Sequence, residues 1–237
     1  MGMQTVAARV GGRPPLIAVD DIVRAGRELG MRRLSVNAVA ARLGVSATAL
    51  YRHVEGRWEL ERLVGESLLA ELDLRDDPDA DTEQHLLGFG LQLCEFAAAH
   101  PGLASYLQVL FPRGEAGARL LADEVDALGR RGYPADAAVV LASAVATLAI
   151  SLAARDDDTA EATGGDDAGG FAVERDAAAD RLAADGTLGP TRAALPQLPG
   201  DEFRRLLLIA SIRGLVAAIP PDRPIVDVVA DLTGGTR

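Results

Sequence analysis

The chain of 237 residues is 49% hydrophobic and 25% charged, with a formal net charge of −11. This composition is typical of a globular protein and excludes a fibrous or intrinsically disordered chain. The single cysteine, Cys94, cannot form an internal disulfide, and residues 1–13 lack the apolar core of a signal peptide. We therefore expect a cytoplasmic protein.

Positive and negative charges are unevenly distributed along the chain. Residues 1–58 contain nine arginines and four acidic residues, whereas the remainder contains 15 arginines and 31 acidic residues, and lysine is absent. A basic N-terminal segment attached to an acidic body indicates an anionic partner for that segment alone.

The N-terminal part is predicted to contain an arm and three short helices. Residues 1–15 have no apolar periodicity and are expected to form a flexible arm. Apolar spacing then predicts a first helix that ends at Gly30. Ser35 is placed to cap a second helix, which ends at Gly44 in a left-handed conformation, and Ser46 to cap a third, very short helix.

Longer helical patterns follow, and they predict helices over Trp58–Leu74, Glu83–Ala99, Leu103–Phe111, Ala116–Arg130, Asp136–Ala154 and Asp201–Ile219. No alternation of β-branched and polar residues is present, so the predicted fold is all-α. Between the last two helices, residues 155–185 are rich in aspartate and glycine. We expect them to form a mobile acidic loop that can include a helical piece around Val173–Ala184.

Residues 137–154 form an uncharged run of 18, which is the lower limit for a membrane span. Eight of these residues are alanines, and Ser143, Thr147 and Ser151 place a polar stripe at i, i+4 and i+8. A helix of this kind suits close packing against another helix in water. We therefore predict no membrane insertion.

The most informative segment is residues 34–57, LSVNAVAARLGVSATALYRHVEGR. Two predicted helices meet there across a short turn at Gly44, with the small Ala40 where they cross and Val39 and Leu50 between them. This is the pattern of a helix-turn-helix, whose second helix can enter the major groove of B-DNA. The outward side chains of that helix can contact phosphates and base edges, and they are Ser46, Ala47, Thr48, Tyr51 and Arg52.

The motif G-V-S-x-x-x-L-Y-x-H-V occupies residues 44–54, and the basic Arg57 follows it. With this motif, residues 16–63 resemble the DNA-binding head of TetR-family transcriptional repressors. The resemblance implies a homodimeric, all-α repressor with a helix-turn-helix domain over residues 16–57. It also implies a ligand-binding and dimerisation domain over residues 58–237, with a small-molecule pocket.

The resemblance and the helix geometry together imply roles in DNA binding. Base edges are assigned to Ala47, Thr48 and Arg52, and phosphates to Tyr51, His53 and Arg57. The remaining DNA-binding candidates are Ser35 and Asn37 at the start of the second helix, Ser46 (foremost a helix cap), and Arg13, which can enter the minor groove from the arm. The alternatives to these DNA-binding roles are that Tyr51 is an ordinary surface residue, that His53 packs on the helical core, and that Arg13 belongs to a disordered tail.

The body is expected to supply a dimer interface and a cavity. One head reads too few base pairs to be specific, so we expect a homodimer on a palindromic operator. Helices 137–154 and 201–219 would form a four-helix bundle with their symmetry mates, through Ala144, Leu148, Phe203, Leu207, Ala210, Gly214 and Ala217. Candidate cavity residues, each of which can instead belong to the core, are Phe89, Leu93, Phe96, Tyr106, Leu110, Phe111 and Thr147.

The sequence contains no recognisable catalytic set. None of the three histidines has a metal-ligand spacing to another candidate ligand, and Cys94 lies in an apolar stretch typical of a buried small side chain. We predict neither an enzyme nor a cofactor or metal site. The leading hypothesis is a repressor released from DNA by a small-molecule ligand. The alternatives are an activator or architectural DNA-binding protein without an effector and, from another class, an α-helical enzyme or carrier.

Overall fold

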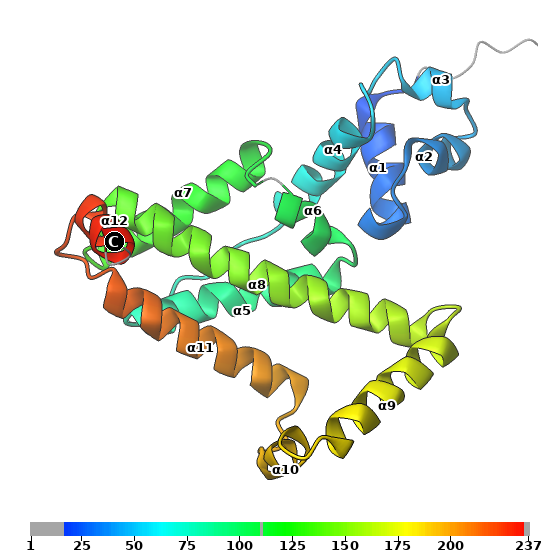
Figure 1. The fold of residues 1–237 in the computed structure, drawn as a ribbon. Coiled ribbons are helices and arrows are strands. Elements are labelled where there is room, and N and C mark those ends of the chain that lie inside the picture. The colour runs from blue at the N-terminus through cyan, green and yellow to red at the C-terminus, as the bar shows by residue number, and fades with distance from the viewer. Residues whose placement is uncertain (1–16, 110, 235–237) are drawn as a thin grey trace, which may run out of the picture.

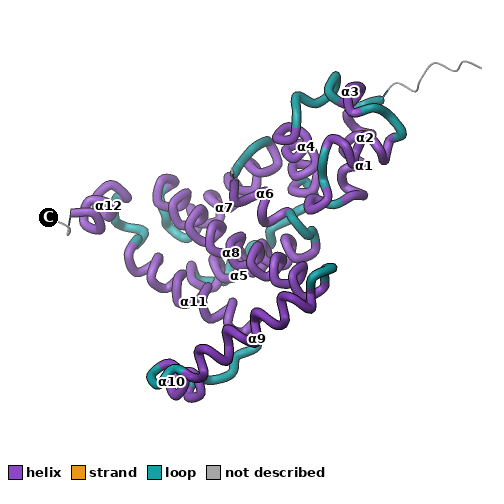
Figure 2. Tube along the Cα trace, turned by 45° about the vertical axis from the view of Figure 1, so that its right-hand side comes forward, coloured by secondary structure: helices purple, strands orange, loops and turns teal. Residues whose placement is uncertain are grey.

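The computed structural model describes residues 17–109 and 111–234. Over these ranges the chain forms helices and connecting segments and no strand, which confirms the predicted all-α class (Figure 2). The first three α-helices form a small head at one end of the molecule, and α4 joins it to a larger helical body (Figure 1).

The head comprises α1 (Val19–Leu29), the 3₁₀ turn η1 (Met31–Arg33), α2 (Val36–Leu43) and α3 (Ala47–Leu50). The predicted helix ends are confirmed. Gly30 and Gly44 have φ of 77° and 69°, which glycine adopts without strain. The Ala38 amide donates to Ser35 Oγ (3.1 Å), and the Ala49 amide donates to Ser46 Oγ (3.2 Å). These serines therefore cap α2 and α3 as expected.

The connecting helix α4 (Arg57–Leu69) ends earlier than the predicted Leu74. After Leu69 the backbone tightens, because the Glu71 and Leu72 amides donate to carbonyls only three residues back. Arg119 of the body donates to the Leu69 and Leu72 carbonyls, at 3.5 Å each. A long-range partner for the last carbonyls thus ends the helix, which the apolar spacing of α4 could not reveal.

The body consists of α5 (Thr82–Ala99), α6 (Leu103–Val109), α7 (Glu115–Arg130), α8 (Ala135–Gly164), α11 (Gly200–Ala218) and α12 (Ile225–Gly234). Helix α8 is central and packs against α5, α6, α7 and α11 (Figure 1). Leu86, Leu141 and Leu208 are fully buried where α5, α8 and α11 meet. Cys94 is buried as expected, and its thiol donates to the Ala149 carbonyl (3.3 Å).

Helix α8 is long and apolar enough to cross a membrane by composition, but 56% of its most apolar 18-residue window is buried inside the protein. Its apolar side chains are therefore largely explained by the core of the body. The buried side chains of α8 include the small Ala137, Ala138 and Ala149.

The expectation of a loop over most of residues 155–185 is wrong. Helix α8 continues to Gly164, α9 spans Ala168–Ala184, and α10 (Leu188–Ala194) follows. The helical piece expected around Val173–Ala184 is confirmed, because it lies within α9. Asp157 stabilises the α8 extension, since it accepts from the Gly102 amide (2.7 Å) and pairs with Arg32 of the head (2.5 Å). Asp156 is likewise paired, with Arg204 of α11, and alanines favour helix in α9 despite its glycines. Helices α9 and α10 project from the body before the chain returns to α11 (Figures 1 and 2).

Candidate DNA-binding surface and effector cavity

The exposed surface of α3 brings together most of the sequence-predicted DNA contacts. Thr48, Tyr51 and Arg52 are exposed, with 56% of Tyr51 accessible to solvent. Ala47 and His53 are half-buried, while Leu50 points inward and is fully buried. The short helix and the turn that follows it therefore expose a hydroxyl, a phenol and a guanidinium, while Leu50 anchors the helix in the core.

Ion pairs separate the arginines of the head into engaged and available groups. Arg27 pairs with Glu71 (2.5 Å) and Arg42 with Glu28 (2.5 Å). Arg57 also pairs, at 2.6 Å from Glu61, although its side chain is 76% exposed. A phosphate must therefore compete with Glu61 for Arg57. In the described part of the head, the exposed Arg52 has no acidic partner within ion-pair distance.

The start of α2 offers a second group of polar side chains. Ser35 and Asn37 are exposed there, and the Ser35 hydroxyl is engaged as the helix cap. Exposed amides at a helix N-terminus attract anions. The remaining candidate, Arg13, lies outside the described residues.

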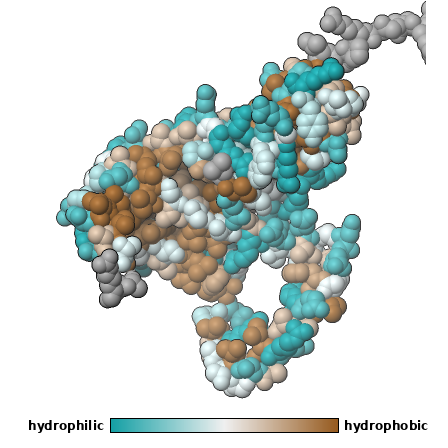
Figure 3. Space-filling view, turned by 45° about the horizontal axis from the view of Figure 1, so that its top comes forward, coloured by the Kyte–Doolittle hydropathy of each residue, from teal (hydrophilic) through white to brown (hydrophobic). Residues whose placement is uncertain are grey.

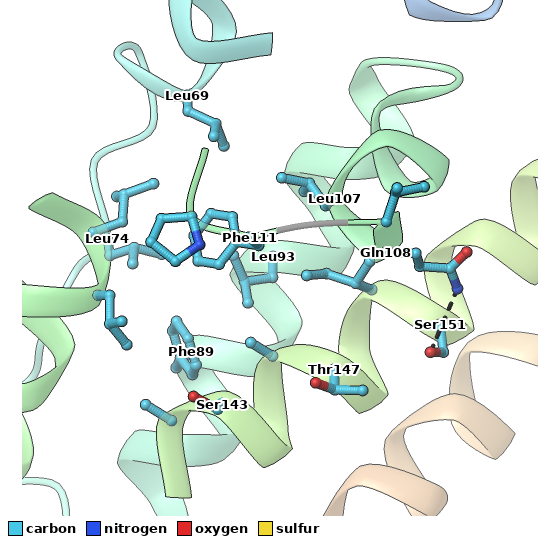
Figure 4. A pocket seen from close by; sticks show the side chains of 17 residues that line it. Leu69, Leu74, Phe89, Leu93, Leu107, Gln108, Phe111, Ser143, Thr147 and Ser151 are labelled. Atoms are coloured by element: carbon cyan, nitrogen blue, oxygen red, sulfur yellow. Dashed lines mark hydrogen bonds between the residues drawn. The ribbon is translucent and has the colours of Figure 1, made fainter. Parts of the chain in front are cut away.

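A cavity of about 570 Å³ lies within the body, between the end of α4, α5, α6, α7 and α8 (Figure 4). Of the predicted lining residues, Phe89, Leu93, Phe111 and Thr147 line it. The expected lining role is wrong for two others: Phe96 stacks on His100, at 4.4 Å between ring centroids, and Tyr106 packs under Arg113. Helical spacing alone does not reveal which side of α5 or α6 faces the cavity.

Leu110 lies outside the described residues. Sequence reasoning also missed lining residues on other elements. The largest such group is aliphatic and comes from α4, α6, α7 and α8, and a smaller polar group completes the wall. These further lining residues include Leu69, Leu74, Gln108, Ser143, Ile150 and Ser151.

The segment between α6 and α7 contacts both this cavity and α4. Phe111 and Pro112 line the cavity. The next residue, Arg113, has its guanidinium carbon 4.4 Å from the Tyr106 ring centroid and 5.2 Å from that of Trp58, the second residue of α4. Burial raises the pKa of Tyr106 to about 12, so the ring beneath Arg113 stays a neutral phenol. Three consecutive residues thus connect the cavity wall to the connecting helix.

The other end of this segment is also attached to α4. The Glu66 carboxylate accepts hydrogen bonds from the amides of Ala116 (2.8 Å) and Gly117 (3.3 Å), in the first turn of α7. A carboxylate at a helix N-terminus accepts hydrogen bonds from otherwise unpaired amides and interacts favourably with the positive end of the helix dipole. The segment between α6 and α7 is thus attached to α4 at both of its ends.

A buried polar cluster that sequence reasoning missed lies beside the cavity. His85 Nδ1 is 2.9 Å from Asp76 Oδ1, and His85 Nε2 is 2.9 Å from Glu124 Oε1. Hydrogen bonding to Arg131 holds the pKa of Asp76 well below its usual range, whereas burial raises the pKa of Glu124. The three groups come from separate elements, so no sequence spacing could reveal them. Within the described residues, no cluster suits a metal ion.

The residues predicted at a dimer interface lie at the surface of α8 and α11. Phe203, Ala210, Gly214 and Ala217 are exposed, and Ala144, Leu148 and Leu207 are half-buried. Missed exposed apolar residues on the same helices include Val139, Val140 and Leu206. Figure 3 shows a broad hydrophobic area on one face of the body, whereas the head is mainly hydrophilic.

The sequence matches no protein-family model and no curated protein. Among solved structures, apo ActR from Streptomyces coelicolor has a TM-score of 0.71 at 20% identity, covering 86% of this chain and 99% of that one. The complex of ActR with actinorhodin has a TM-score of 0.70 at 23% sequence identity, with the same coverage of both chains. ActR is a TetR-family protein. This chain has the TetR-family fold.

The same TetR-family fold occurs in proteins from other organisms. A TetR variant from Acinetobacter baumannii AYE, in complex with minocycline, has a TM-score of 0.57 at 19% identity, covering 84% of this chain and 96% of that one. BioQ from Mycobacterium smegmatis has a TM-score of 0.58 at 18% sequence identity, covering 85% of this chain and 99% of that one. In each of these comparisons the similarity spans most of both chains.

Proposed function

We propose that this chain is a transcriptional regulator of the TetR family that binds DNA as a homodimer and releases it when a small molecule fills the body cavity. The observation that carries the proposal is the combination of an exposed surface at α3 and the turn after it, with Thr48, Tyr51 and Arg52, and a largely apolar cavity in one TetR-type fold. ActR and the TetR variant were each solved with a small molecule. The protein would act in the cytoplasm and would not be an enzyme.

In this proposal, α3 enters the major groove and divides its contacts between base edges and phosphates. Arg52 reads bases, because its guanidinium is free to form the two parallel hydrogen bonds that guanine accepts. Tyr51 contacts the phosphate backbone and fixes the depth of the helix in the groove. The excess of arginine over acidic residues in the first 58 positions adds attraction that does not depend on sequence.

The second copy is held through α8 and α11. Exposed apolar residues on these helices support this pairing, because contiguous apolar surface marks interaction sites. Phe203, for example, is 41% exposed and Leu206 is 49% exposed. A symmetric pair would place two α3 helices on half-sites about 34 Å apart, on one side of the duplex. The operator is therefore palindromic.

Ligand release follows from the connection between the cavity and α4. A ligand that displaces Phe111 and Pro112 also displaces Arg113, and with it Trp58 at the start of α4. The heads then change separation and no longer match successive major grooves. To weaken DNA binding about a hundredfold, the ligand must favour the released state by roughly 2.7 kcal/mol.

Selection of bound sites from random duplex DNA tests this function. We expect the selected sites to contain an inverted repeat, and the Arg52→Ala variant to select sites with one or more base positions relaxed. Absence of any enriched sequence with the unmodified protein would contradict the proposal. A single unrepeated site would retain DNA binding but contradict the symmetric dimer.

A further inference from the structure

The effector cavity has an uncharged wall. Seventeen side chains line it, and Gln108, Ser143, Thr147 and Ser151 are its polar members; the others are aliphatic, aromatic or proline. The ionisable side chains of the Asp76–His85–Glu124 cluster line a separate cavity of about 230 Å³, and Leu74 and Phe89 line both cavities. An ionised ligand would lose hydration in the larger cavity without gaining a counter-ion, which costs several kcal/mol.

The polar members of the wall form a row. Ser143, Thr147 and Ser151 are spaced by four residues, so they share one side of α8 at intervals of about 6 Å. All three are exposed, which places them at the mouth of the cavity. Gln108 Nε2 extends the row from α6 by donating to Ser151 Oγ (3.5 Å). Figure 4 shows Ser143, Thr147 and Ser151 in order along α8, with Gln108 of α6 reaching Ser151.

The rest of the wall suits a flat apolar body. Phe89 and Phe111 contribute two rings from different elements, among leucines and Ile150. Figure 4 shows the Phe89 ring beside Ser143 and the Phe111 ring further from α8. Aromatic rings bind a planar ring system by offset stacking or edge contact. The volume of about 570 Å³ lies within the range of cavities that hold a drug-sized molecule.

We propose that this cavity binds an uncharged fused-ring aromatic compound with hydroxyl or carbonyl oxygens along one edge. The rings lie between Phe89 and Phe111, and the oxygen-bearing edge faces the α8 hydroxyls of Ser143, Thr147 and Ser151. A hydroxyl both donates and accepts, so this row matches phenol and ketone oxygens alike. The inference rests on the effector-binding role proposed above and specifies its chemistry.

Three probes test this chemistry by calorimetric titration of the full chain. They are 1,8-dihydroxyanthraquinone, its 3-sulfonate, and anthracene, which share one three-ring body; the sulfonate adds only a charge, and anthracene lacks the edge oxygens. We expect the dihydroxy compound to bind with one molecule per chain. The sulfonate should bind at least tenfold more weakly, because its charge has no partner in the cavity.

Two variants separate the oxygen-bearing edge from the rings. Thr147→Val keeps the side-chain shape and removes the hydroxyl. It should weaken binding of the dihydroxy compound about fivefold, the effect of one net hydrogen bond, and leave binding of anthracene unchanged because anthracene has no oxygen. Ser105→Ala, on α6 outside this cavity, should change neither. Equal binding of the sulfonate, or equal effects of Thr147→Val on both neutral probes, would overturn the inference. Failure of all three probes while site selection succeeds would overturn the ligand class alone.

Discussion

Replacing Arg113 by methionine should lower the free energy of unfolding by about 2–3 kcal/mol. Methionine keeps the unbranched stem and removes the guanidinium, which is 6% exposed and lies 3.7 Å from the Glu61 carboxylate. A desolvated cation–π contact contributes about 2 kcal/mol, and an exposed one about 0.5–1 kcal/mol. The buried Tyr106 therefore supplies the larger share, and Trp58, which is 62% exposed, the smaller one.

Double-mutant cycles measure these two shares separately. Urea unfolding at a fixed chain concentration should give a coupling energy of about 1–2 kcal/mol between Arg113→Met and Tyr106→Leu, and of about 0.5–1 kcal/mol between Arg113→Met and Trp58→Leu. A coupling to Tyr106 below about 0.3 kcal/mol would refute the packing argument. So would a larger coupling to Trp58 than to Tyr106.

The same variant tests transmission from the cavity to α4. Arg113 does not line the 570 Å³ cavity, so Arg113→Met should leave the affinity for 1,8-dihydroxyanthraquinone within about twofold, a change of roughly 0.4 kcal/mol. It should, however, reduce the effect of that compound on DNA affinity. An unchanged effect on DNA affinity, with the probe bound, would show that the signal bypasses residues 111–113.

Three further changes have definite expected outcomes. Arg52→Ala should reduce discrimination at one base position by about 1–3 kcal/mol and weaken nonspecific binding less, as measured by competition between operator and scrambled duplexes. Gly26→Ala should lower the free energy of unfolding by about 1–3 kcal/mol, because the new Cβ would lie 2.5 Å from a methyl group of Val64 in α4. The control is Gly88→Ala, whose new Cβ would meet no neighbouring atom within 4 Å and should not lower the stability. Asp76→Asn should lower stability at pH 7 and flatten its decline between pH 5 and 3. The depressed pKa of Asp76 stabilises the fold above the unfolded-state pKa of about 3.9, and this contribution is lost as pH falls toward the folded-state value. Asp73 is exposed, so Asp73→Asn serves as the control. If the stability of both variants fell equally with decreasing pH, this reasoning would be contradicted.

Local signals in the sequence predicted the head accurately. Ser35 and Ser46 cap their helices, and Gly44 adopts positive φ, because each of these effects depends on atoms within a few residues. Apolar periodicity likewise located α5 and α7 within one residue at each end. The roles of the exposed side chains in DNA binding stay predictions.

Features that depend on distant residues could not be predicted. The α8 extension is attached to the head through Asp157, which composition alone assigned to a loop. Tyr106 was expected in the cavity, but Arg113 covers its ring on the side of α4. The buried His85 cluster joins three elements whose packing no spacing rule describes. In each case a charged or aromatic group gained its role from a partner many residues away.

Binding to operator DNA as a symmetric dimer can be measured by sedimentation of the protein with a duplex that carries the selected site. We expect a complex of two chains per duplex, whose formation falls steeply as salt rises because phosphate contacts release counterions. Tyr51→Phe should weaken binding to selected and unrelated duplexes by the same factor. A protein that stays monomeric and binds all duplexes alike at moderate salt would show that it is not a sequence-specific dimeric regulator.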